Sequence, residues 1–194
     1  MRYLLALTFS ISLLCSVSAQ KKAINIPHLW ESYSFYPKMV PGFNFMNDGK
    51  HYTVLENASI VQYDLTSGNK TNIIYSASDF NFSDYTFSKD EQKIVLEVNR
   101  EQIYRRSSKA NFFVWDRTKE ALTEVSKSGK QRYATLNDQA DKIAFVRKNN
   151  LFYRDLKSNK EIQITKDGLN NSIINGATDW VYEEEFAMSR AFFW

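Results

Sequence analysis

The sequence has few residues that can cross-link the chain or bind a metal. Cys15 is the only cysteine and lies in an apolar N-terminal segment that is expected to be cleaved off, so disulfide bonds cannot stabilise the mature chain. The only histidines are His28 and His51, and the sequence offers neither of them a carboxylate partner at ligand spacing. Protein metal sites combine several such side chains. The sequence therefore predicts neither a metal site nor a cofactor.

The sequence also lacks an excess of one charge. Its 25 basic and 22 acidic residues give a net charge of +3, and no basic cluster is larger than the pair Arg105-Arg106. Nucleic-acid-binding proteins usually carry a dense basic patch, so no nucleic-acid partner is expected. The 43% of hydrophobic residues are enough for one sizeable core. Aromatic residues make up 15% of the chain and favour an all-β fold.

No apolar run is long enough to span a membrane comfortably. A short apolar run at residues 4–14 follows Arg2, and Val17-Ser18-Ala19 supplies the small residues of a cleavage site. Together they predict a secretory signal peptide at residues 1–19. We therefore expect a secreted or periplasmic protein whose mature chain begins at Gln20.

A pattern of short apolar strands recurs three times after an extended lead-in, which is expected at residues 20–41 because they show no sustained period. Each copy has a strand, a polar turn and a second strand, and then a second hairpin whose turn carries an acidic residue. The first hairpins span residues 43–55, 85–96 and 133–145, and the acidic turn residues are Asp64, Asp116 and Asp155. Four strands per copy predict the blades of a β-propeller. A β-sandwich is the alternative, but it does not explain the repetition.

The most unusual stretch lies near the C-terminus, where three consecutive glutamates stand among aromatic residues. Glu183, Glu184 and Glu185 are flanked by Trp180 and Phe186. Neighbouring carboxylates repel one another, and aromatic neighbours add a desolvation cost that a cation relieves. The stretch therefore indicates a site for a ligand's ammonium group. The structural alternative is a solvated acidic turn, about one helical turn long, whose aromatic side chains belong to the core.

The sequence also predicts the structure of two further segments. Residues 99–110 form the longest irregular piece between the repeats, and their cations Arg100, Arg105 and Arg106 indicate a solvated loop. Residues 191–194 follow the acidic stretch and are expected to begin another strand.

Residues 174–185 read INGATDWVYEEE, which closely resembles the segment that marks the dipeptidyl peptidase IV family of the prolyl oligopeptidase group. The resemblance extends over most of the mature chain, because the repeats agree with that family's propeller. It implies an eight-bladed propeller that caps an α/β-hydrolase domain. Residues 42–194 would then form an incomplete N-terminal propeller domain of about three and a half four-stranded antiparallel blades, with a short helical insertion that carries the three glutamates.

The resemblance also implies a role for each candidate side chain. Glu184 and Glu185 would bind the substrate's free N-terminal ammonium, while Glu183 would face the scaffold. Two fixed carboxylates can satisfy two of the three donors of an ammonium group. Arg105 would lie near the substrate carbonyl, with Arg106 as the alternative. The implied substrates are peptide N-termini with Pro or Ala second, which would be released as X-Pro or X-Ala dipeptides.

The sequence departs from the family pattern in its catalytic machinery. It contains no G-x-S-x-G elbow, and neither histidine is placed to complete a triad, so no catalytic residue is assigned. The implied partners are the missing hydrolase domain of the same polypeptide and a second copy in a homodimer of the full-length enzyme. The alternative function is a non-catalytic secreted β-propeller that binds peptides or protein partners.

Overall fold

The computed structural model describes residues 24–37 and 42–194. The chain divides into two compact units, Met1–Val40 and Pro41–Trp194. The signal peptide predicted at residues 1–19 lies outside the described residues. The described part of the first unit contains the short helix α2 (Ile26–Trp30), which Asn25 caps by accepting a hydrogen bond from the His28 N–H group at 2.9 Å. The prediction of an extended lead-in is therefore wrong for this segment.

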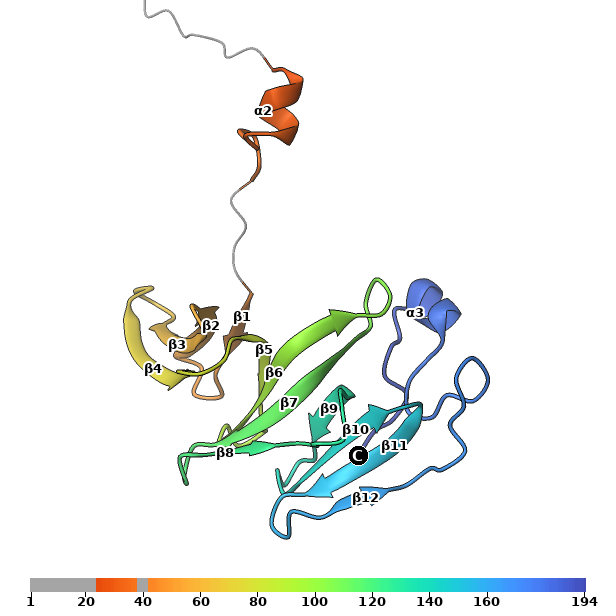
Figure 1. The fold of residues 1–194 in the computed structure, drawn as a ribbon. Coiled ribbons are helices and arrows are strands. Elements are labelled where there is room, and N and C mark those ends of the chain that lie inside the picture. The colour runs from red at the N-terminus through yellow and green to blue at the C-terminus, as the bar shows by residue number, and fades with distance from the viewer. Residues whose placement is uncertain (1–23, 38–41) are drawn as a thin grey trace, which may run out of the picture. The chain divides into compact units, whose positions relative to one another are not determined.

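The second unit consists of three four-stranded antiparallel sheets that follow one another along the chain (Figure 1). In each sheet the strands are neighbours in sequence order, as in the blades of a propeller. The first sheet contains β1 (Phe43–Phe45), β2 (His51–Glu56), β3 (Ser59–Asp64) and β4 (Lys70–Ser76). The second contains β5 (Phe82–Phe87), β6 (Lys93–Gln102), β7 (Ser108–Asp116) and β8 (Ala121–Glu124). The third contains β9 (Arg132–Leu136), β10 (Lys142–Arg147), β11 (Asn150–Asp155) and β12 (Glu161–Gln163). The all-β prediction with four-stranded antiparallel blades is confirmed.

The core lies between the sheets. Along β6, Ile94 and Leu96 point to one face and pack with residues of the first sheet such as Ile60. Val95 points to the opposite face and packs with residues of the third sheet such as Phe145. Successive side chains of a strand alternate between the two faces of its sheet. The middle sheet is therefore buried on both sides, which explains why β6 carries a continuous apolar run.

The third strand of each sheet ends at an acidic residue that closes the turn to the fourth strand. Asp64 Oδ1 accepts hydrogen bonds from the N–H groups of Thr66 (3.1 Å) and Ser67 (2.7 Å). Asp155 Oδ1 accepts from the N–H groups of Lys157 (3.0 Å) and Ser158 (2.7 Å). Asp116 makes the same kind of turn in the second sheet. Where the chain reverses, the carboxylate thus accepts hydrogen bonds from backbone N–H groups that have no partner strand.

Two segments differ from expectation. Most of the segment at residues 99–110 belongs to strands and not to a loop. Strands β6 and β7 pair as far as Gln102 and Ser108, so the loop contains only residues 103–107. Residues 191–194 form no strand. Instead, Phe192 is buried against Val146 and Ala177. Within the described residues, no helix is long and apolar enough to cross a membrane.

Candidate functional site

The acidic stretch forms the helix α3 (Trp180–Phe186), which stands beside the extended β6–β7 hairpin (Figure 1). Asp179 caps its first turn by accepting from the Tyr182 N–H group at 3.0 Å, and Ala187 ends it in the left-handed conformation at φ 53°. The segments before and after the helix are joined by a hydrogen bond, which the Thr178 N–H group donates to the Ser189 carbonyl at 3.2 Å. This bond closes the loop that contains α3.

Helical geometry gives the three glutamates different surroundings, because consecutive side chains are about 100° apart around the axis. Glu183 is fully buried. Glu184 is half-buried and Glu185 is exposed. The expectation that Glu183 faces the scaffold is confirmed.

The buried carboxylate of Glu183 binds the tip of the β6–β7 hairpin. Its Oε1 atom accepts hydrogen bonds from the backbone N–H groups of Arg106 at 2.6 Å and Ser107 at 2.9 Å. Burial alone would raise the pKa of Glu183, but the Ser107 side chain and these two N–H groups favour the charged form. Together with the charge of Arg132, they lower the pKa below its ordinary value of 4.5. Glu183 is therefore an anionic link between α3 and the hairpin.

The same contact brings Arg105 to α3. Its Nε atom lies 3.5 Å from Glu184 Oε2, and the two side chains are 75% and 15% exposed, respectively. Two of the three predicted substrate-binding residues, Arg105 and Glu184, thus meet in space. Glu185 lies on the same helix, next to Glu184. The roles of these residues in binding substrate remain predictions.

The aromatic residues of α3 point away from the core. Trp180, Tyr182 and Phe186 are exposed, and the rings of Tyr182 and Phe186 pack against each other at 5.5 Å. The structural alternative placed these aromatic residues in the core and the glutamates in solvent. The arrangement in the structure is different, because Glu183 is buried and the aromatic residues are exposed.

A pocket of about 860 Å³ adjoins the start of α3, and Asp179 and Trp180 line it together with Tyr104 from the hairpin loop. Several cations line it, and two of them, Lys109 and Lys130, pair with Glu101 at 2.7 and 3.3 Å. Arg105, Glu184 and Glu185 do not belong to its lining. The candidate ammonium site thus lies outside this pocket.

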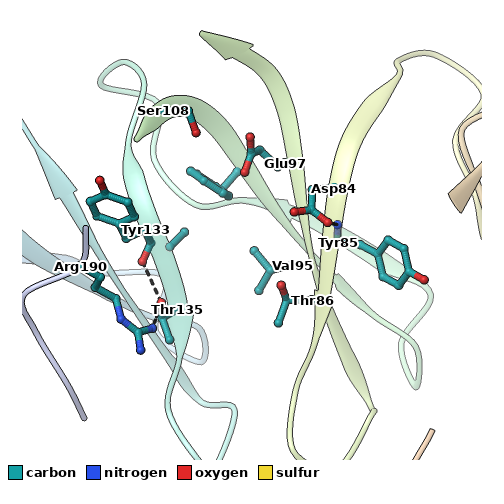
Figure 2. A pocket seen from close by; sticks show the side chains of 11 residues that line it. Asp84, Tyr85, Thr86, Val95, Glu97, Ser108, Tyr133, Thr135 and Arg190 are labelled. Carbon is teal, nitrogen blue, oxygen red and sulfur yellow. Dashed lines mark hydrogen bonds between the residues drawn. The ribbon is translucent and has the colours of Figure 1, made fainter. Parts of the chain in front are cut away.

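A smaller pocket of about 300 Å³ is lined by residues of the second and third sheets and by Arg190 (Figure 2). Figure 2 shows Asp84 and Glu97 on one wall and Arg190 on the other, where Arg190 donates to Thr135 Oγ1 at 2.9 Å. Burial raises the pKa of Glu97, and the charge of Arg100 opposes this shift. None of the predicted site residues lines this pocket.

One expectation about the histidines is wrong. The sequence offered His51 no carboxylate partner at ligand spacing, but its Nδ1 atom lies 2.5 Å from Asp48 Oδ2 in the β1–β2 turn. This pair belongs to a turn. No group of three or more histidine, cysteine or acidic side chains that could hold a metal occurs in residues 24–37 and 42–194.

Comparisons with known proteins identify the family. A family model for the dipeptidyl peptidase IV (DPP IV) N-terminal region matches residues 88–194. The crystal structure of Porphyromonas gingivalis dipeptidyl peptidase 4 is 33% identical and superposes with a TM-score of 0.79, covering 88% of this chain and 26% of that one. A probable dipeptidyl-aminopeptidase B of Podospora anserina is 40% identical over 111 residues, which are 55% of this chain and 12% of that protein. Dipeptidyl peptidase 4 of Felis catus is 30% identical over 149 residues, which are 74% and 20% of the two chains.

The chain thus spans between 12% and 26% of the length of these relatives. Its three sheets match the propeller part of that length, and the family model includes both the β6–β7 loop and α3. The chain belongs to the dipeptidyl peptidase IV family and forms part of its N-terminal β-propeller.

Proposed function

We propose that this chain supplies the ammonium anchor of a secreted serine exopeptidase that releases X-Pro or X-Ala dipeptides. Glu184 and Glu185 bind the free N-terminal ammonium of the substrate, and Arg105 binds a peptide carbonyl oxygen. The observation that supports the proposal is the ion pair between Arg105 and Glu184 on a helix that is tied to the arginine's own loop.

The pairing suggests how the empty site is stabilised. The Arg105 guanidinium is mostly exposed and lies 3.5 Å from a single carboxylate oxygen, and ion pairs of this kind are weak. A substrate ammonium is compact and carries three donors, so it can bind both glutamates at once. Arg105 is then released to donate to a carbonyl oxygen, for which its planar fork is well suited.

The same arrangement accounts for specificity. Peptides without a free N-terminus would leave two carboxylates unpaired, which disfavours their binding. Because Glu184 and Glu185 hold the first residue of the substrate in this proposal, the register of the substrate is counted from that residue. Cleavage itself requires an activated nucleophile, which we assign to an α/β-hydrolase domain of the same polypeptide.

The test is made in the peptidase that carries this propeller together with its hydrolase domain. Replacing Glu184 or Glu185 by Gln keeps the side-chain volume but removes the charge. We expect kcat/KM for a dipeptide substrate with a free N-terminus to fall by about a hundredfold, on the scale measured for loss of a buried charge partner. Glu183→Gln is the matched control and should have a much smaller effect. Near-normal kcat/KM in both the Glu184 and Glu185 variants would contradict the anchor.

Export is a separate part of the proposal. Arg2, the apolar run at residues 4–14 and the small residues before Gln20 support a cleaved signal peptide. N-terminal sequencing of the protein recovered from outside the cytoplasm should begin at Gln20. Recovery of a soluble cytosolic product that keeps Met1 would rule out the signal peptide.

A further inference from the structure

Glu183 is the one glutamate of the three that the anchor does not use, yet it makes the closest contacts. Its Oε1 atom accepts from Arg106 and Ser107, the two residues that directly follow Arg105. These groups are 77 and 76 positions away in sequence. A single carboxylate oxygen therefore joins the loop that carries the arginine to the helix that carries the other two glutamates.

The loop has its own internal hydrogen bonds, but these do not fix it to α3. The N–H groups of Ile103 and Tyr104 both donate to the Ser107 carbonyl, at 2.9 and 3.3 Å. Gln102 Nε2 donates to the Arg105 carbonyl at 3.0 Å. In the described part of the chain, both hydrogen bonds that cross from residues 103–107 to α3 end on Glu183. The remaining link is the exposed Arg105–Glu184 ion pair, which is too weak to hold a loop by itself.

Burying Glu183 is unfavourable unless its hydrogen bonds compensate. Glu183 and Ser107 are both fully buried, and an isolated buried carboxylate is strongly destabilising. Two backbone N–H groups on one charged oxygen form charge-assisted hydrogen bonds, which are stronger than neutral ones. A seven-residue helix is also too short to be stable without tertiary contacts. The bonds to Glu183 thus order the loop and the helix together.

We propose that Glu183 is a positioning residue that sets the distance between Arg105 and the carboxylates of Glu184 and Glu185. This inference rests on the proposed function of those three side chains. Without Glu183, the hairpin tip and α3 move independently. The entropy lost in ordering both elements then weakens binding of the ammonium and the carbonyl oxygen.

The experiment compares Glu183→Ala with Glu183→Gln in the full-length peptidase. Gln keeps an oxygen that can accept from both N–H groups, whereas Ala removes the link. We expect Glu183→Ala to lower kcat/KM at least tenfold, mainly through a higher KM, because ill-placed binding groups weaken substrate binding. Glu183→Gln should stay within about threefold of the wild type. Glu161→Ala is the matched control, because Glu161 likewise accepts two hydrogen bonds, from Arg147 and Ser126, but is only half-buried and lies in the third sheet.

A double-mutant cycle separates positioning from general destabilisation. If Glu183 acts through Arg105, Glu183→Ala should cost much less kcat/KM in an Arg105→Ala background than in the wild type. Equal losses in the two backgrounds would overturn the inference. So would a neutral Glu183→Ala variant in an enzyme that still depends on Glu184 and Glu185. If those two glutamates were also dispensable, the proposed function itself would be wrong.

Hydrogen exchange gives a readout that does not depend on the Ala variant folding. The backbone amides of Arg106 and Ser107 should be protected in the wild type and in Glu183→Gln, because both keep the acceptor. Exchange of these two amides at the rate of an unstructured loop in the wild type would contradict the link directly.

Discussion

Two adjacent arginines have different contacts in this structure. Arg105 brings its side chain to Glu184, whereas Arg106 contributes its backbone N–H group to Glu183. Sequence alone left open which of the two binds substrate, because neighbouring loop residues have no fixed orientation. The geometry favours Arg105, because it is the one paired with a predicted anchor residue.

The distinction leads to a test by substitution. Arg105→Ala removes the guanidinium that would bind the substrate carbonyl, so kcat/KM for a free N-terminal dipeptide substrate should fall by about tenfold or more, as for other lost charged hydrogen bonds. Arg106→Ala keeps the backbone N–H group that binds Glu183 and should stay within a few-fold of the wild type. Steady-state kinetics of the two variants decide the matter. A larger loss for Arg106→Ala would reverse the assignment.

At the scale of residues, the sequence indicated candidate side chains but not the contacts between them. The three glutamates could be selected because they are consecutive and stand among aromatic residues, and Arg105 from the family resemblance alone. The contacts of Glu183 with Arg106 and Ser107 could not, because they join segments 76 or more positions apart and use backbone donors. A backbone donor leaves no trace in side-chain identity.

Among the structural elements, strands were predicted well and connections poorly. The recurring pattern of apolar strands and polar turns identified β2, β3, β6, β7, β10 and β11, because each of these strands carries apolar residues that are buried in the core. The pattern failed at α2, where a single Asn cap starts a five-residue helix. It also failed in the outer part of the β6–β7 hairpin, where exposed polar residues continue the ladder without an apolar face.

The turns that end the third strands predict a dependence of stability on pH. The Ser158 N–H group is the main reason why the pKa of Asp155 lies below its ordinary value of 3.8, and Ser67 has the same effect on Asp64. A lowered pKa in the folded state stabilises the fold above the unfolded pKa, near 4, and this contribution is lost as the pH falls through the folded value. Asp155→Asn should therefore lower Tm at pH 6 and have progressively less effect below pH 4.

Thermal unfolding of the full-length protein between pH 7 and pH 2 measures this dependence. Asp64→Asn provides an independent repeat in the first sheet and should show the same trend. A Tm difference between wild type and Asp155→Asn that stayed constant over this range would show that the carboxylate charge does not contribute to the turn.

Considered as a whole, the molecule is organised by packing between sheets. The middle sheet is buried on both faces, while the first sheet shows aromatic side chains to solvent. Phe43 and Phe45 of β1 are exposed and pack edge to face at 5.2 Å. Tyr52 and Tyr63 stack beside them at 5.4 Å. Exposed apolar clusters of this kind favour association.

This surface leads to a prediction for the 194-residue chain produced without further domains. Since unpaired strands and exposed aromatic residues template contacts between copies, the isolated chain should elute from size-exclusion chromatography as a broad, concentration-dependent mixture of oligomers. Replacing Phe43 and Phe45 by Lys should shift the mixture towards the monomer, because both side chains lie outside the clusters between the sheets.

Phe145→Lys is the matched control. It places the same charge in the buried core between the second and third sheets and should increase association by unfolding the chain. A sharp, long-lived monomer peak with cooperative melting for the unmodified chain would show instead that these three sheets form a self-sufficient domain.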